Sequence, residues 1–294
     1  MCPRRVTGAS NNMNYGQAGW GKTNRMAQMC KPDNNGNAHT VMLAVDHPYF
    51  YGPTTGLEDP RETIRPLVPY ADAISPAKGS LVFSLDPLVP TPVILRVTGG
   101  NSMTRREELS DEHIITSIEE AVKLNAVGVS VSVYIDTEHQ SQTLRSLGQL
   151  ANEASKYDLL VLGITAVGAK LEPMVKGEGE GSDDFDAARY FAHAGRIIQD
   201  NGADIVKTYF VDGGDEVRGG IQAPIVIAGG KKVPEKEALE FTSQAIQAGA
   251  DGVDMGRNIF QSEDPVAMIQ AVRSVVHEGK TPDEGFELFQ SLRD

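Results

Sequence analysis

The feature of this sequence that most constrains its fold is a regular alternation, from Val41 onward, of short apolar runs with amphipathic helical patterns. The runs have the length of buried strands, and a helix between successive strands is the crossover that a parallel sheet requires. Eight segments qualify, namely VMLAV (41–45), DAIS (72–75), PVILRV (92–97), VGVSVSVYI (127–135), LLVLGIT (159–165), DIVKTYF (204–210), PIVIA (224–228) and DGVDM (251–255). Eight such units predict an α/β fold, a closed (β/α)8 TIM barrel rather than an open sheet.

The segments between these runs carry helical stripes with recognisable ends. We expect one helix behind the candidate cap Ser110, and three more over residues 144–154, 188–198 and 234–249. The apolar positions of the first are Ile114, Ile115, Ile118, Ala121 and Val122. In the run 127–135, valines alternate with Ser130, Ser132 and Tyr134, which predicts valines facing the helices and the polar set facing the barrel interior.

A chain of 294 residues suits one barrel with additions. Residues 1–40 are rich in Asn, Gly and Met without periodicity, and we expect an irregular N-terminal arm there. The barrel domain then spans residues 41–294. The acidic, glycine-rich stretch at 168–186 is predicted to be a loop insertion within it.

Composition excludes several classes of partner. The net charge of −13 would repel phosphate backbones and anionic lipid, so we expect neither nucleic acid nor a membrane as partner. The sequence has neither an apolar run long enough to span a bilayer nor the pattern of a signal peptide. Two cysteines build no disulfide framework, which favours the cytoplasm, and the scattered histidines predict no metal site.

One motif points to a different function. The segment Gly16-Gln-Ala-Gly-Trp-Gly-Lys22-Thr23 matches the pattern of a nucleotide P-loop. A working P-loop joins a strand to a helix, whereas the residues before this segment read as no strand and those after it as two helical turns at most. A P-loop NTPase remains an alternative, which loss of ATP binding in Lys22→Ala would support.

Two side chains are candidates for chemistry at the predicted strands. Lys207 lies inside the apolar run 204–210, where an ammonium either forms an ion pair or is held as a nucleophile, unless it reaches out to water from the strand edge. Asp46 ends the first predicted strand, and the ends of barrel strands are where active sites form. Asp46 could instead simply cap the loop.

Two glycine motifs follow the last two predicted strands. Gly229, Gly230 and Lys231 follow the seventh, and Gly256 and Arg257 follow the eighth. Loops at these places in TIM barrels bind phosphate, because glycine lets backbone N–H groups approach the oxygens and a basic side chain adds charge. Two ordinary tight turns would give the same pattern.

Long strings of the sequence resemble the class I aldolase family that includes the archaeal-type fructose-bisphosphate aldolases. The strings are VMLAVDHPYFYGPTTGLE, PVILRVTGGNS, DIVKTYFV, PIVIAGGKK and GVDMGRNIFQSEDPVAM. The resemblance implies a Schiff-base lysine at Lys207, an acid at Asp46, phosphate loops at the glycine motifs, and a homo-oligomer. It is closest to the thiolase branch, which acts on a phosphorylated dicarbonyl.

One departure separates the two activities of the family. Where the sugar-phosphate aldolases carry Trp-x-Tyr at the end of the fifth strand, this chain offers Gly163 and Thr165, so we expect poor aldol cleavage unless Thr165→Tyr restores the phenol. The thiolase activity would transfer an acetyl group to coenzyme A, a co-substrate, and leave dihydroxyacetone phosphate, with Asp46 and Tyr134 handling protons. Aldol cleavage of a sugar phosphate, and a barrel that binds a phosphorylated ligand without turnover, remain alternatives.

Overall fold

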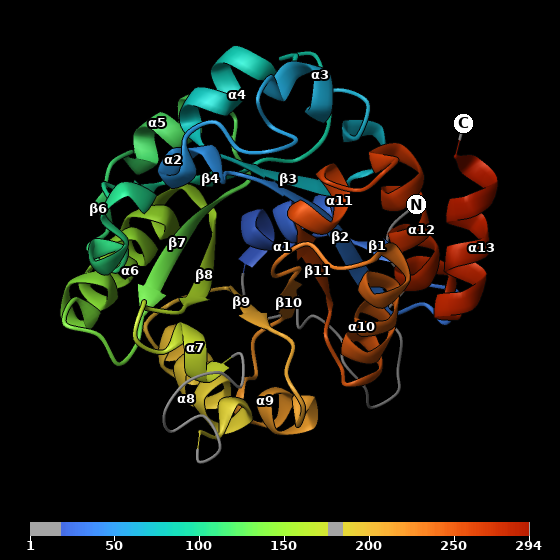
Figure 1. The fold of residues 1–294 in the computed structure, drawn as a ribbon. Coiled ribbons are helices and arrows are strands. Elements are labelled where there is room, and N and C mark those ends of the chain that lie inside the picture. The colour runs from blue at the N-terminus through green and yellow to red at the C-terminus, as the bar shows by residue number, and fades with distance from the viewer. Residues whose placement is uncertain (1–18, 176–184, 294) are drawn as a thin grey trace.

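A ring of eight parallel strands forms the centre of the molecule (Figure 1), and the computed structural model describes residues 19–175 and 185–293. The strands are β2 (Ala38–Val45), β3 (Ala73–Pro76), β4 (Ile94–Arg96), β7 (Gly128–Tyr134), β8 (Leu160–Ala166), β9 (Ile205–Tyr209), β10 (Ile225–Ala228) and β11 (Gly252–Met255). They pair in the order β2, β11, β10, β9, β8, β7, β4, and β3 closes the ring by pairing with β2 and bridging to residues 93 and 96. The predicted barrel and all eight predicted strands are confirmed.

Helices surround the strands in Figure 1 and bury the outward-facing side chains. The principal ones are α4 (Lys78–Ser84), α5 (Ile118–Lys123), α6 (Gln140–Ala154), α8 (Ala187–Asp200), α9 (Gly214–Gly220), α10 (Glu235–Gln247), α12 (Pro265–Glu278) and α13 (Pro282–Leu292). Val129, Val131 and Val133 of β7 lie in the cluster that these helices cover. The predicted facing of this strand is therefore confirmed.

Short elements fill the connections. They are β1 (Lys31–Pro32), α2 (Pro48–Tyr51), α3 (Pro60–Ile64), η2 (Val68–Tyr70), β5 (Thr98–Gly99), η3 (Met103–Glu108), β6 (His113–Ile114), η4 (Ser155–Tyr157), α7 (Glu172–Val175) and α11 (Arg257–Phe260). Within the predicted insertion at 168–186, residues 176–184 lie outside the described residues. Among the described segments no helix is long and apolar enough to cross a bilayer.

The predicted helix behind Ser110 is wrong in its first part. Residues His113–Ile114 form β6, which pairs antiparallel with β5, and the side chain of Ile115 is 57% exposed. The helix α5 begins only at Ile118, capped by the Ser117 hydroxyl, which accepts a hydrogen bond from the Glu120 backbone N–H at 3.2 Å. The isoleucine spacing imitated a helical stripe, whereas Ser117 and Glu120 carry the actual start signal.

Residues 19–40, assigned above to an irregular arm, contain the helix α1 (Gly19–Met29) and the start of β2. Met26 and Met29 of α1 pack against the apolar interior of the barrel, beside Met42, Ile94 and Val226. The Lys22 ammonium of the P-loop match lies 2.7 Å from the Asp204 carboxylate, just before β9. Because this places Lys22 at the end of the barrel where strands begin, within an ion pair, it argues against a phosphate-binding lysine.

Three aspartates tie neighbouring strands together at that same end. Asp72, Asp204 and Asp251 each stand one residue before a strand. Each side chain accepts a hydrogen bond of 2.8 or 2.9 Å from a backbone N–H of the adjacent strand, namely those of Val41, Val161 and Ile225 respectively. The strand starts are thereby fixed, and the opposite end, where the strands finish, is left for the loops that build a site.

Candidate active site

The Lys207 side chain lies in the barrel wall with its ammonium held by a second strand. Its Nζ is 2.7 Å from Oδ2 of Asp254 on β11, and the two side chains are only 12% and 1% exposed. The lysine is therefore enclosed and paired, and it does not reach out to water. The other oxygen, Asp254 Oδ1, is buried without a hydrogen-bond partner among the described residues. An unsatisfied buried carboxylate oxygen is costly unless a ligand contacts it.

Asp46 and His47 follow the end of β2, at the end of the barrel where the strands finish, which we call the mouth. Asp46 Oδ2 lies 3.6 Å from Nη1 of Arg96, and Asp46 Oδ1 lies 3.8 Å from Nδ1 of His47. The imidazole packs edge to face on Phe260, with ring centroids 5.4 Å apart. Burial, followed by the positive charges of Arg257 and Lys207, lowers the pKa of His47 to about 3. His47 is therefore neutral at physiological pH.

A buried ionic network forms the neighbouring wall. Glu112, with a fully buried side chain, receives the guanidinium of Arg96 at 2.7 Å and the hydroxyls of Tyr49 at 2.6 Å and Thr98 at 2.7 Å. The Tyr134 hydroxyl also donates to Glu112, at 3.2 Å. Arg96 thus bridges Glu112 and Asp46, and it connects two of the predicted catalytic residues, Asp46 and Tyr134, through one network.

The network fixes the protonation of its phenols. Burial, and then the charge of Glu112, raises the pKa of Tyr134 well above its usual range. Burial is the largest single effect on Arg96 and disfavours its charge, but Glu112, Tyr49 and Asp46 together outweigh burial and raise the pKa of Arg96. Tyr134 is therefore a neutral phenol whose O–H is directed at a carboxylate.

The two glycine loops are joined by a residue that the sequence analysis did not single out. The fully buried amide of Asn258 donates to the backbone oxygens of Gly229 and Lys231 and accepts from the Val233 N–H at 2.9 Å. Asn258 belongs to α11, which follows β11. It therefore holds the loop after β10 against the loop after β11.

Within these loops the predicted residues have different surroundings. Gly230 has a left-handed backbone (φ +67°) that suits glycine, and Lys231 is exposed. A Cβ on Gly256 would lie 2.5 Å from both the Ala44 carbonyl oxygen and the His47 ring, so glycine is required there by packing alone. The Nε atom of Arg257 is buried and has no hydrogen-bond partner in the described part of the chain. Arg257 is thus an unsatisfied donor next to the site.

The assignment of Thr165 to the place of the aldolase Tyr is wrong. Thr165 points out of the barrel wall, where its hydroxyl lies 3.0 Å from that of Thr208, because the inward positions of β8 are Leu160, Leu162 and, by alternation, Ala166. There is also no free space at Gly163, since a Cβ added to this glycine would lie 2.3 Å from an Ile198 methyl group.

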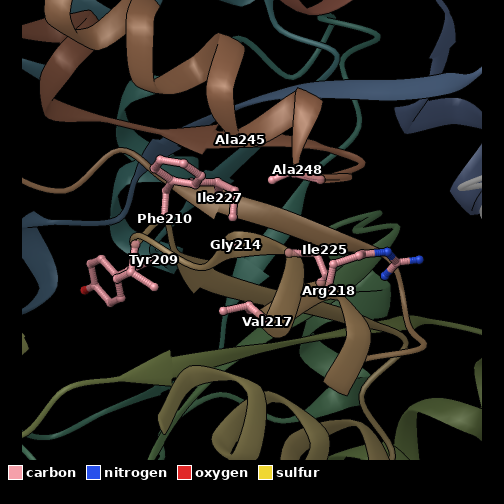
Figure 2. A pocket seen from close by; sticks show the side chains of 11 residues that line it. Tyr209, Phe210, Gly214, Val217, Arg218, Ile225, Ile227, Ala245 and Ala248 are labelled. Carbon is pink, nitrogen blue, oxygen red and sulfur yellow. The ribbon is translucent and has the colours of Figure 1, made fainter. Parts of the chain in front are cut away.

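A crevice elsewhere on the barrel is separate from this chemistry. It encloses about 270 Å³ of empty space, part of it open solvent, between β9, β10 and the helices α9 and α10. In Figure 2, Phe210 and Ile227 form one side and Val217 the other, with Tyr209 and Arg218 at opposite ends. Ile225 and Ile227 belong to the helix-facing cluster, so the crevice lies outside the barrel wall, whereas Lys207 faces inward.

Five residues of the site were not predicted from the sequence, namely Asp254, Arg96, Glu112, His47 and Asn258. Asp254 and Arg96 carried a detectable signal, because each is a charged residue inside an apolar strand, as Lys207 is. Glu112 lies in a connection without periodicity and gave none. A cluster of three or more metal-ligating side chains is absent from the described segments.

Comparison with known proteins shows which family and which relatives this chain is similar to. The family model described as "DeoC/LacD family aldolase" matches residues 40–262. A 3-hydroxy-5-phosphonooxypentane-2,4-dione thiolase of Salmonella paratyphi A is 44% identical over 277 residues, covering 94% of this chain and 89% of that protein. The thiolase of the same name from Yersinia pseudotuberculosis is 43% identical over 93% of this chain and 88% of its own.

Solved structures agree on the fold. An archaeal fructose-1,6-bisphosphate aldolase, described with its catalytic Lys covalently bound to the carbinolamine intermediate of the substrate, superposes with a TM-score of 0.70 at 23% identity, over 81% of this chain and 94% of that one. A fructose-bisphosphate aldolase from Slackia heliotrinireducens gives a TM-score of 0.76 at 18% identity, over 100% and 96% of the two chains. With the family model matching most of the barrel, this chain is a member of the DeoC/LacD class I aldolase family.

Proposed function

We propose that this chain is a 3-hydroxy-5-phosphonooxypentane-2,4-dione thiolase, which transfers an acetyl group from that phosphorylated dicarbonyl to coenzyme A and leaves dihydroxyacetone phosphate. The observation that carries the proposal is the 44% identity with thiolases across 94% of the chain. It is supported by Lys207, a half-buried lysine on the sixth barrel strand that is paired with Asp254.

Lys207 is the nucleophile of this proposal. Asp254 Oδ2, at 2.7 Å, accepts a proton from Nζ, and the free amine attacks the C4 carbonyl of the dione. Loss of water gives a protonated imine. The positive nitrogen then attracts electrons from the adjacent carbon, which prepares the bond between C2 and C3 to break.

Coenzyme A completes the transfer. Its thiol sulfur attacks the C2 carbonyl, the C2–C3 bond breaks, and the electron pair moves to the imine, so that acetyl-CoA leaves and an enamine remains on Lys207. Protonation of C3 and hydrolysis of the imine release dihydroxyacetone phosphate. We assign Asp46 to carry the thiol proton to C3, and a share in proton handling by Tyr134 requires its O–H to turn from Glu112 to the substrate.

The phosphate group would be held by the two joined loops. Backbone N–H groups of Gly229, Gly230 and Gly256, with the side chains of Lys231 and Arg257, are the groups we assign to its oxygens. The unsatisfied Nε of Arg257 supports this assignment, because a phosphate oxygen would supply the missing acceptor.

The alternative is aldol cleavage of a sugar phosphate such as fructose 1,6-bisphosphate, which the fold permits. The test incubates the protein with the phosphorylated dione, with and without coenzyme A, and identifies products by mass spectrometry after borohydride trapping. We expect acetyl-CoA and dihydroxyacetone phosphate only when coenzyme A is present, and a reduced adduct on Lys207. Cleavage of fructose 1,6-bisphosphate at an ordinary enzymatic rate of ~1–1000 per second without coenzyme A would replace the thiolase with the aldolase.

We also propose that the enzyme is a homo-oligomer working in the cytoplasm. Large apolar side chains on and after α4 support a protein contact there, since Phe83 is 75% and Leu88 89% exposed. Light scattering after gel filtration measures the assembly. A monomer at micromolar concentration would contradict this part of the proposal.

A further inference from the structure

The contact between Lys207 and Asp254 shows which residues of different strands lie at the same height along the barrel axis. Lys207 is in register with Val226 of β10, which is in register with Gly252 of β11. Its ammonium nevertheless contacts Asp254, two residues further along β11. This offset is the tilt of barrel strands, which lifts the register by about one residue per strand.

The same offset applied in the other direction leads to β7. Lys207 is in register with Ile164 of β8, and Ile164 with Ser132 of β7. Two residues before Ser132 along β7 is Ser130. Ser130 therefore lies at the level of Lys207 inside the barrel.

Two further steps lead to β3. Ser130 is in register with Arg96 of β4, which bridges to Ala77, directly after β3. Two residues before Ala77 is Ser75. This places Ser75 at the level of Ser130.

The path around the barrel closes on itself. Asp254 of β11 is in register with Met42 of β2, and Met42 with Ala73 of β3, so two residues further along β3 is again Ser75. Alternate strands thus contribute Ser75, Ser130, Lys207 and Asp254 to one layer of four, which is the way TIM-barrel interiors are filled. Below this layer, Met42, Ile94, Leu162 and Val226 belong to the apolar interior cluster.

Both serines are buried with their hydroxyls unused. Ser75 is 3% and Ser130 1% exposed, and neither Oγ has a hydrogen-bond partner among the described residues. A buried hydroxyl without a partner costs about 1–3 kcal/mol, so alanine would serve packing better at both positions.

We infer that Ser75 and Ser130 bind oxygen atoms of the hydroxylated, carbonyl-bearing carbon chain of the substrate while it is attached to Lys207. Each hydroxyl can donate to a carbonyl oxygen or accept from a hydroxyl group, so the pair would select for an oxygenated chain over a plain hydrocarbon one. The inference rests on the proposed function for the identity of the substrate. It adds two contact residues that the reaction does not otherwise require.

The test compares Ser75→Ala and Ser130→Ala with Thr40→Val. Thr40 is a matched control, because its hydroxyl is equally buried and unpartnered but lies two residues before Met42, on the far side of the apolar layer. We expect kcat/KM for the phosphorylated dione to fall about 5- to 100-fold in each serine variant and to stay within twofold in Thr40→Val. The melting temperature should stay equal or rise in all three.

Two outcomes decide between the inference and the proposed function. Serine variants that both retain kcat/KM within about twofold of wild type overturn the inference while the thiolase proposal stands. Should the wild type fail to turn over the dione, the proposed function falls, and the rate of borohydride trapping of dihydroxyacetone phosphate on Lys207 becomes the readout. Slower trapping in the serine variants than in Thr40→Val would then support the two contacts, and equal rates would refute them.

Discussion

At the residue scale, Lys207 is both the proposed nucleophile and the ion-pair partner of the buried Asp254. We expect Lys207→Ala to abolish turnover, and also to destabilise the fold by about 3 kcal/mol, because it leaves the buried Asp254 carboxylate unpaired. The double variant Lys207→Met with Asp254→Asn should recover the melting temperature while staying inactive. Turnover above a few per cent of wild type in either protein would remove Lys207 from its role.

Arg257 is a second residue whose role can be isolated. Arg257→Ala should raise KM for the phosphorylated substrate about 10- to 100-fold, the loss expected for one charge-assisted hydrogen bond. KM for an unphosphorylated analogue should change far less, measured under the same steady-state conditions. An equal rise of KM for both substrates would show that Arg257 has a structural role at the mouth and does not bind the phosphate.

Ala166 takes the place that the sequence had suggested for Thr165. Because Ala166 alternates with the inward-facing Leu160 and Leu162, Ala166→Tyr points a phenol toward the mouth that holds Lys207. We expect this variant to gain cleavage of fructose 1,6-bisphosphate, assayed without coenzyme A. Thr165→Tyr should only lose stability, since its side chain meets Thr208 and the outer layer, and a gain of aldol cleavage there would contradict the assigned facing.

At the element scale, the three aspartates that join strand starts differ in how their charge is compensated. Asp72 contacts Arg273 at 2.9 Å and His277 at 2.7 Å, and Asp204 contacts Lys22. Burial raises the pKa of Asp251 to about 6, above its ordinary value of 3.8. A group whose folded pKa is raised loses its stabilising contribution as pH rises from 3.8 through 6.

Asp251→Asn should therefore stabilise the protein by about 3 kcal/mol at pH 8, because it keeps the acceptor for the Ile225 N–H without the buried charge. Asp72→Asn is the matched comparison and should destabilise it by about 3 kcal/mol, since it leaves the Arg273 guanidinium without its carboxylate partner. Urea unfolding at pH 8 measures both. A loss of stability in both variants would show that ionised Asp251 is compensated after all.

Also at this scale, periodicity predicted the strands better than the connections. The eight apolar runs were found because each strand is buried on both faces, so its pattern is local and strong. The helix start behind Ser110 was misread, because residues 110–116 lack a periodic buried face and contain instead one buried carboxylate, Glu112, which binds Arg96. The helix α1 was expected to be two turns at most and is longer, because only Gly21, Met26 and Met29 of its 11 residues are buried and its apolar face is weak.

For the whole molecule, the barrel order supplied the strongest prediction of the site and also marked its limit. Counting strands placed Lys207 on the sixth and the glycine loops after the seventh and eighth, and the structure has them in that order. Which side chains meet inside depends on the tilt of all eight strands together. That is why the partner of Lys207 is Asp254, although the strand register would suggest Gly252.

The acid stability of the whole molecule should depend on the electrostatics of this mouth. Burial and neighbouring positive charges lower the pKa of His47 to about 3, against an ordinary value of 6.5, so the unfolded chain binds a proton that the folded chain refuses. Stability from this group is complete above pH 6.5 and is lost as pH falls from 6.5 toward 3, by about 2 kcal/mol between pH 7.5 and 5. His47→Gln replaces the imidazole with an amide that does not titrate but still fills much of the same buried space. The free energy of unfolding should therefore fall less steeply with acid in His47→Gln than in wild type, measured by urea titration at pH 7.5, 6 and 5, and parallel profiles would show that His47 is charged in the folded protein.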